Sequence, residues 1–459
     1  MMKSMSITNG SVQKTLILLM YPFLIAGCFQ QLAYMTDGII IGRYSVSSSL
    51  AVIGGSGSMV ISIFNGFASG IISGAMFVLA YHYGAMDSLR TAVSVKTGIF
   101  LALVGGIVFT CLFYCLAGVT LEFLKVPYSL LDDSIHYLRL YSIGFTPYFL
   151  FQMCIGLMRA TGETKKSTQT MILSFFLNIA LDYLFVALLH LNSSGIALSF
   201  ILTQCISLLF SLYDLNMRIP QRMLPFCLDR DILLQIFRIG LPSSVISTAY
   251  AFTNVLIQTS INLLGSDVIA AYAIHSKIDN FYWITLACLG TGMTTFFGQN
   301  FGAHKYSRMK KGLRAGILIG YAVTLGIILL YYFGRNMLTG LFTTDPDIHK
   351  IAASILGMMS PFYLAYPAIE IITPALKCLG KARQSSLITI LFICGTRVLW
   401  ILFEAIPHLS YQNILLCYPI SWIITTVVFV LYYETVERKM LDERHPCAHR
   451  TVTCETAKQ

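Results

Sequence analysis

Two acidic residues fall inside long apolar stretches of the sequence, where a charge is costly. Asp37 belongs to an apolar segment that begins near Thr15, and Asp182 follows Asn178 by four residues in another such segment. Near the middle of a membrane-spanning helix an aspartate costs about 2.5 to 3.5 kcal/mol, so such residues usually face a bundle interior or a water-filled cavity and handle ions or substrate. In a simpler interpretation, Asp37 lies close enough to the outer headgroups to be hydrated.

The two carboxylates are expected at one depth in the membrane. Asp37 lies about 15 residues after Pro22, and Asp182 lies about 15 residues after Ser167, so each is about 22 Å along a helix from the same face. Asn178 and Asp182 share a helix face because they are four residues apart. Two carboxylates in a low-dielectric site cannot both stay ionised without a large energetic cost, so they should share a proton, a sodium ion or a cationic ligand. Alternatively, Asp182 merely hydrogen-bonds with Asn178 or nearby backbone.

Composition places these residues in a polytopic membrane protein. The chain of 459 residues is 56% hydrophobic and 11% charged, with a mean hydropathy of +0.72, which is more apolar material than a soluble core can bury. Its 12 Cys lie mostly in apolar segments, so we expect buried thiols and no disulfide framework. The polar start followed by a long apolar run predicts that there is no cleavable signal peptide.

About twelve apolar segments are long enough to span a bilayer. Their approximate limits are 15–41, 50–80, 95–119, 134–158, 168–190, 194–217, 238–264, 268–298, 312–334, 350–376, 385–406 and 411–433. The expected fold class is therefore an all-α polytopic membrane protein.

Basic residues concentrate in the loops that follow even-numbered segments. These loops carry Arg90, Lys96, Arg159, Lys165, Lys166, Arg218, Arg222, Arg230, Arg238, Lys305, Arg308, Lys310, Lys311, Arg314, Lys377, Lys381 and Arg383, whereas the odd-numbered loops carry Arg43, Lys125, Arg335 and Lys350. The positive-inside rule then places both termini in the cytoplasm. The net charge of +10 is explained by loop residues beside anionic membrane lipid, so nucleic acid is not an expected partner.

The two halves of the chain resemble each other. A shift of about 218 to 220 residues lays Pro22 on Pro242 and lays the run 159–162 on 377–380. Six crossings return the chain to its starting side, so the halves should be two six-helix bundles related by a pseudo-two-fold axis along the membrane normal. The expected parts are an amino-terminal lobe (1–217), a cytoplasmic linker (218–237), a carboxy-terminal lobe (238–434) and a cytoplasmic tail (435–459).

Several motifs resemble the bacterial MATE (multidrug and toxic compound extrusion) family. They are Asp37-Gly-Ile-Ile-Ile-Gly-Arg, Phe-Gly-Gln-Asn-Phe-Gly-Ala at 297–303, the two Arg/Lys-x-x-Gly loops, the run 265–279, and Asn178-Ile-Ala-Leu-Asp182. The resemblance implies two lobes arranged in a V, which export drugs as protons or sodium ions flow inward. In part of the family a helix-6 threonine joins the Asp/Asn/Asp set to hold sodium. Here that position falls at Phe200, with Ser199 adjacent and Thr203 one turn away, which favours protons slightly.

The amino-terminal lobe supplies the expected ion-coupling residues and most of the expected substrate cavity. Asp37, Asn178 and Asp182 are the coupling residues, with Na⁺ as an alternative to the proton, and no cofactor is expected. Aromatic and amide side chains would provide cation–π and hydrogen-bonding surfaces for small amphipathic organic cations, namely Gln30, Tyr34, Tyr141, Phe145, Tyr148, Gln152 and Tyr183.

The carboxy-terminal lobe has a second polar set. Its candidates for the substrate cavity are Asn254, Gln258, Lys277, Asp279 and Glu370, and His275, Arg397 and Glu404 lie nearby in sequence. Glu370 aligns with Gln152 of the first half. The simpler interpretation is that Lys277 or Arg397 pairs with Asp279, Glu370 or Glu404 inside the bundle. Three prolines, at 361, 367 and 374, suggest a kinked helix that acts as a gate.

Other readings of the sequence are less well supported. Gly66, Gly70 and Gly74 form a small-residue ridge that suits helix packing, and the tail residues His445, His449 and Cys454 match no zinc spacing. The sequence contains no His-Glu-x-x-His cluster of the kind that would suggest an enzyme. A lipid-linked saccharide flippase of the same superfamily is the alternative, but several cavity Arg or Lys residues would be needed. We expect a monomeric exporter in the bacterial cytoplasmic membrane.

Overall fold

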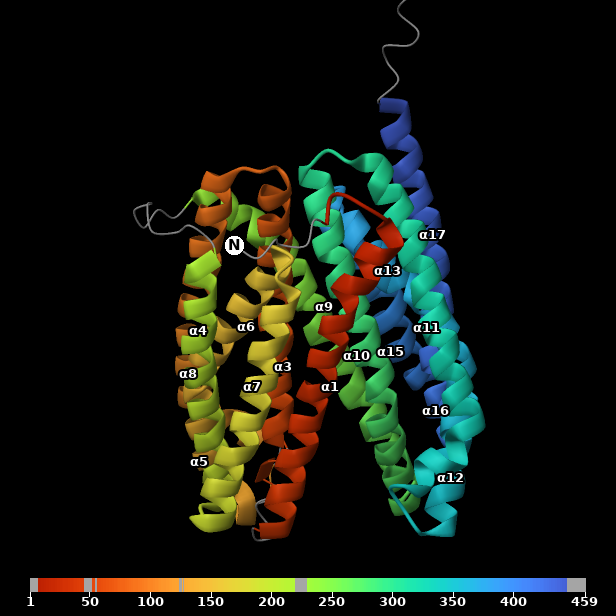
Figure 1. Ribbon diagram of the computed structural model, residues 1–459. Coiled ribbons are helices and arrows are strands. Elements are labelled where there is room, and N and C mark those ends of the chain that lie inside the picture. The colour runs from red at the N-terminus through yellow and green to blue at the C-terminus, as the bar shows by residue number, and fades with distance from the viewer. Residues whose placement is uncertain are drawn as a thin grey trace, which may run out of the picture.

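The chain forms two helical bundles that stand side by side (Figure 1). The computed structural model describes residues 7–44, 52–53, 56–123, 126, 128–218 and 229–443. Within these ranges nearly every residue is helical. The all-α polytopic class predicted from the apolar segments is confirmed.

Each bundle is built from elements that match six of the predicted segments. The amino-terminal lobe contains α1 (Val12–Tyr44), α3 (Ser56–Gly84), α4 (Ser88–Phe123), α5 (Tyr128–Ile143), α6 (Phe145–Ala160), α7 (Thr164–Asp182), η1 (Tyr183–Leu188) and α8 (Asn192–Arg218). The carboxy-terminal lobe contains α9 (Arg230–Asn262), α10 (Ser266–Gly302), α11 (Tyr306–Gly340), α12 (Pro346–Met359), η2 (Ser360–Ala365), α13 (Pro367–Cys378), α14 (Ala382–Thr389), η3 (Ile390–Gly395), α15 (Thr396–Trp400), η4 (Ile401–Ala405), α16 (Tyr411–Leu415) and α17 (Cys417–Glu443).

Some of the predicted membrane spans are too polar to be identified as spans by their length and hydropathy alone. Among the described residues, 10 helices or continuous helical stretches meet that test, and α5 with α6, which meet at a 42° bend, make an eleventh. The predicted segment 268–298 lies in α10, whose His275, Lys277 and Asp279 lower its hydropathy. Helix α10 packs against α1, α3, α11, α12 and α13, and of these three polar residues His275 is buried whereas Lys277 is exposed.

The internal repeat extends to the irregularities of the helices. The break at Gly144 between α5 and α6 corresponds, at a shift of about 218 residues, to the 3-10 segment η2, which contains Pro361 and precedes Pro367. The same shift lays the π-helical η1 on the π-helical η4. The predicted segment 350–376 is therefore interrupted by η2 where its prolines predicted a kink. The matching break in the first half lies three residues before Pro147.

Several predicted boundaries differ from the structure, among them both ends of the carboxy-terminal lobe. Helix α9 begins at Arg230, earlier than the predicted residue 238, because the side chain of Asp229 accepts hydrogen bonds from the backbone N–H groups of Asp231 and Ile232. Helix α17 continues to Glu443, so the first part of the predicted tail is helical. Residues 219–228 of the linker and the remaining tail, with His445, His449 and Cys454, lie outside the described residues.

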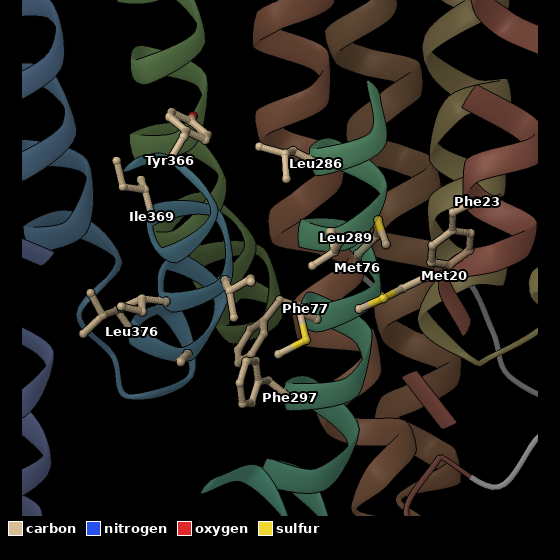
Figure 2. Close-up of a cluster of buried hydrophobic side chains, with 14 of the residues drawn as sticks. Met20, Phe23, Met76, Phe77, Leu286, Leu289, Phe297, Tyr366, Ile369 and Leu376 are labelled. Carbon is tan, nitrogen blue, oxygen red and sulfur yellow. The ribbon is translucent and has the colours of Figure 1, made fainter. Parts of the chain in front are cut away.

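The lobes touch along α3 and α1. Helix α3 packs against α9 and α10, while α1 packs against α10 and α11. Figure 2 shows apolar side chains from α1, α3, α10 and α13 gathered at this junction, among them Met20, Phe23, Met76, Phe77, Leu289 and Phe297. The glycine ridge predicted to serve packing does so, since a Cβ on Gly70 would lie 2.3 Å from the backbone nitrogen of Ser244.

The lobes approach each other closely at the end of the molecule where α1 begins and α17 ends (Figure 1). The bundles converge toward that end and diverge toward the other (Figure 1). A Cβ on Gly84 would lie 2.1 Å from the carbonyl oxygen of Gln299, and one on Gly302 would lie 1.9 Å from that of Tyr81. These two contacts exchange under the repeat, so one pseudo-symmetric pair of glycines lets the backbones of both lobes meet.

Candidate functional site

The two predicted carboxylates are neighbours in the amino-terminal lobe. Asp37 lies on α1 and Asp182 is the last residue of α7, and their carboxyl groups are close enough to interact electrostatically. Asp182 is fully buried and accepts a hydrogen bond from the hydroxyl of Ser199 on α8. Asp37 Oδ1 and Asp182 Oδ2 are buried and have no hydrogen-bond partner among the described residues. The pair therefore needs a proton or another cation.

A cavity of about 100 Å³ adjoins this pair. Its lining includes Gln30, Asp37, Tyr141, Tyr148, Gln152, Asn178, Phe200, Thr203 and Gln204. The rings of Tyr141 and Phe200 stack with centroids 4.1 Å apart, and Gln152 Nε2 donates to the Tyr148 hydroxyl over 3.3 Å. Asn178 lies on the cavity wall, so the predicted coupling triad is brought to one place.

Two of the predicted aromatic residues lie elsewhere. Phe145 is buried in the core, where its ring stacks on that of Phe64 at 4.1 Å. Tyr183 is 46% exposed on the outer surface, where it meets Tyr44 edge to face. The position of a residue along a helix predicts its depth in the membrane. It does not predict which way the helix is rotated, and therefore does not predict whether the side chain faces the cavity. The side chain of Tyr34 lies outside the described part of the chain.

Three hydroxyl or amide groups near the acidic pair were not among the predicted site residues. Ser199 donates to Asp182, and the buried Thr203 Oγ1 and Gln204 Oε1 have no hydrogen-bond partner among the described residues. Tyr137 is buried within electrostatic range of both carboxyl groups. The only sequence signal was the position of Ser199 and Thr203 beside Phe200, because a single hydroxyl in an apolar helix is unremarkable.

A second cavity, of about 490 Å³, lies between the two lobes. It is lined by residues of α1, α3, α6, α7, α10 and α13, and it shares Gln30, Tyr148, Gln152 and Met171 with the first cavity. Glu370 of α13 lines it, as the alignment with Gln152 predicted. Its carboxylate occupies space left by Gly290, where a Cβ would lie 2.1 Å from Glu370 Oε1.

Two basic residues that the sequence assigned to cytoplasmic loops also line this inter-lobe cavity. Arg159 lies in the last turn of α6 and Lys377 in the last turn of α13. The two helices end one residue later, at Ala160 and Cys378. Gly162 and Gly380 follow in the adjoining turns, where φ values of 87° and 73° favour glycine. Arg139 of α5 is not part of this lining, and its guanidinium lies over the ring of Tyr114.

The predicted ion pairs of the carboxy-terminal lobe do not form. Asp279 instead accepts hydrogen bonds from the Tyr363 hydroxyl and from Trp283 Nε1, the latter over 2.6 Å. Glu404 lies 3.6 Å from His408. Arg397 is buried, donates to Ser421 and lies 4.4 Å from the centroid of the Tyr418 ring. Aromatic faces and hydroxyls take the place of the expected opposite charges.

Three further candidates of that lobe are displaced from both cavities. Lys277 is exposed and lies 5.9 Å from the centroid of the Phe342 ring. Asn254 is exposed, and Gln258 donates to Asn262 over 2.8 Å. None of these three residues is part of the lining of the cavities described above. The spacing of polar residues in the sequence did not determine which face of α9 or α10 points into the molecule.

Two repeated six-helix lobes, with a pair of neighbouring carboxyl groups in one of them, have the arrangement of secondary transporters built from parallel repeats. A model of the MatE family matches residues 22–184 and 242–406, one segment in each lobe. The chain therefore belongs to the MATE family.

Known proteins resemble the chain over most of its length. It is 23% identical over 444 residues, covering 94% of the chain and 96% of the relative, to the probable multidrug resistance protein YoeA of Bacillus subtilis. It is 27% identical over 266 residues, 56% of the chain and 57% of the relative, to the multidrug export protein MepA of Staphylococcus aureus. An outward-facing structure of a multidrug resistance MATE family transporter superposes with a TM-score of 0.87 at 20% identity, covering 96% and 99% of the two chains.

Proposed function

We propose that the protein is a secondary active antiporter that exports amphipathic organic cations in exchange for protons or sodium ions. The family and the names of the relatives support multidrug efflux as the general activity. The transporter would act as a monomer in the bacterial cytoplasmic membrane, with both termini in the cytoplasm and without a cofactor.

The adjacent, buried carboxyl groups of Asp37 and Asp182 carry the proposal. A proton or Na⁺ bound between them neutralises the charge that would otherwise attract a cationic substrate. Ion and substrate then compete, and by linkage each weakens the binding of the other. The unpartnered oxygens of Thr203 and Gln204 provide further acceptors on the same wall, so the site suits either coupling ion.

The way the lobes meet supports the proposal of alternating access. Their tightest contacts lie at the end assigned to the cytoplasm, where glycines permit backbone contact. The inter-lobe cavity lies between this contact and the other end of the bundles. A structure closed at the cytoplasmic end would release substrate outward, and separation of Gly84 from Gln299 would reopen the cavity inward.

A flippase-like exporter of lipid-linked saccharides is a second candidate. Arg159 and Lys377 in the inter-lobe cavity favour it, because a pyrophosphate group needs basic partners. The carboxylates of Asp37, Asp182 and Glu370 around the same connected space oppose it. The balance supports a cationic group on the substrate.

Accumulation of matched probes tests this choice. Cells with and without the protein are loaded with a hydrophobic cation, such as a quaternary ammonium dye, or with an anion of equal size. We expect lower accumulation of the cation in cells that contain the protein, with little change for the anion. Preferential export of the anion would move the flippase-like function to the front.

A further inference from the structure

The inter-lobe cavity contains two basic groups for which the protein supplies no ion-pair partner among its described residues. Arg159 Nη2 donates to Met171 Sδ over 2.9 Å and its Cζ lies 4.8 Å from the centroid of the Phe23 ring, while its buried Nε has no acceptor. A guanidinium carries five N–H donors, and a thioether is a weak acceptor. Arg159 therefore retains donors for a ligand.

Lys377 is the repeat counterpart of Arg159 and faces the same space. It is 8% exposed, and its Nζ donates to Ser73 of α3 in the opposite lobe over 3.2 Å. The internal repeat thus places one cation from each lobe at the end of the cavity nearest the contact between the lobes. An anionic group held there would touch both lobes at once.

A negatively charged residue, Glu370, lies two helical turns from Lys377. Glu370 and Lys377 are seven residues apart on α13, which corresponds to about 10 Å along the helix axis, and they interact electrostatically. At the matching position of α6 stands the neutral Gln152. The described charged residues in the lining are Arg159, Lys377 and Glu370, so the cavity is basic at one end and acidic at the other.

We propose that this cavity selects amphipathic zwitterions, with the substrate carboxylate between Arg159 and Lys377 and its ammonium group toward Glu370. A volume of about 490 Å³ lies within the range of sites for drug-sized ligands. The spacing fits a rigid ligand whose charges are about 10 Å apart. The proposal rests on the export function proposed above and narrows its substrate class.

A free acid and its ester isolate the role of the basic pair. A fluoroquinolone with a free carboxylate and the methyl ester of the same compound share a cationic amine and nearly the same shape. Binding to the purified protein is measured by fluorescence anisotropy, and uptake is measured in vesicles that contain the protein. We expect the wild type to bind the free acid about tenfold more tightly, since a charge-assisted hydrogen bond has roughly that effect.

The variants Lys377→Met and Arg159→Met remove one charge each with a side chain of similar length. Each should reduce the preference for the free acid over the ester about tenfold, by the same reasoning. Lys377→Arg should retain the preference, as should the matched control Lys381→Met, which removes a charge outside the lining. Thermal melting of each variant identifies any that fails to fold.

The wild-type comparison alone can overturn the inference. Equal binding of acid and ester by the wild type would contradict it, and so would an equal loss for both compounds in the folded Lys377→Met variant. Failure of the export function gives a different result, because neither compound would then be moved across the vesicle membrane, whatever the ratio of their affinities.

Discussion

Alanine at Gly84 should shift the protein away from the conformation in which its lobes touch at the end that carries Gly84 and Gly302. The added Cβ would lie 2.1 Å from the carbonyl oxygen of Gln299 and 2.6 Å from its Cα, whereas ordinary contacts are 3.4 Å or longer. Both partners belong to backbone, so no side-chain rotation relieves the overlap. Overpacking of this kind costs about 1 to 3 kcal/mol.

That penalty acts only when the lobes are in contact. A difference of about 1 to 3 kcal/mol changes the ratio of two states roughly 5- to 150-fold. Gly302→Ala should act in the same direction, because its Cβ would lie 1.9 Å from the Tyr81 carbonyl oxygen. Gly326→Ala is the control, since nothing lies within 4 Å of its added Cβ.

Spin labels at Leu89 and Ser307 report the separation of the lobes. Both positions are exposed, and they correspond under the repeat, in the first turns of α4 and α11. Double electron–electron resonance should show a longer-distance population that grows in Gly84→Ala and Gly302→Ala but not in Gly326→Ala. Identical distance distributions for Gly84→Ala and Gly326→Ala would refute the role assigned to the glycine contacts.

Three further outcomes are expected. Single cysteines between Lys305 and Arg314, in a cysteine-free background, should resist an impermeant reagent added outside whole cells, and strong labelling would reverse the predicted topology. Arg308→Met should lower the melting temperature relative to Lys311→Met, because Arg308 donates to the backbone carbonyls of Ile7, Asn9 and Gly10, a set whose loss costs about 1 to 3 kcal/mol; equal melting temperatures would show that this contact is not stabilising. Ser199→Ala removes a donor to Asp182 and should change the pH dependence of transport, measured in vesicles at a series of external pH values, whereas an unchanged profile would exclude Ser199 from ion coupling.

The sequence predicted the architecture and the acidic pair because both depend on position along a helix. Hydrophobic length set the spans, and the count from Pro22 and Ser167 set the depth of Asp37 and Asp182, which the structure brings together. Hydrophobic length and position along a helix do not predict how the helix is rotated about its axis. Phe145 and Tyr183 therefore appeared to be cavity residues, although one is in the core and the other is on the surface.

The basic pair was missed for a related reason. Arg159 and Lys377 were counted with the loop cations that orient the chain, because both stand just before a helix-ending glycine. In the structure the last turns of α6 and α13 project them into the inter-lobe cavity. The repeat offset that aligned them was a usable signal, since residues related by the pseudo-two-fold axis can face one shared space.

Transport driven by separately imposed gradients tests the central claim most directly. Vesicles containing the wild type, Asp37→Asn or Asp182→Asn are given a proton gradient or a sodium gradient alone, and movement of a hydrophobic cation is followed. The account predicts that one of the two gradients drives transport by the wild type and that each Asn variant still binds the cation but loses gradient-driven movement. Unchanged transport and unchanged ion dependence in both variants would contradict it, because coupling would then reside outside the amino-terminal lobe's acidic pair.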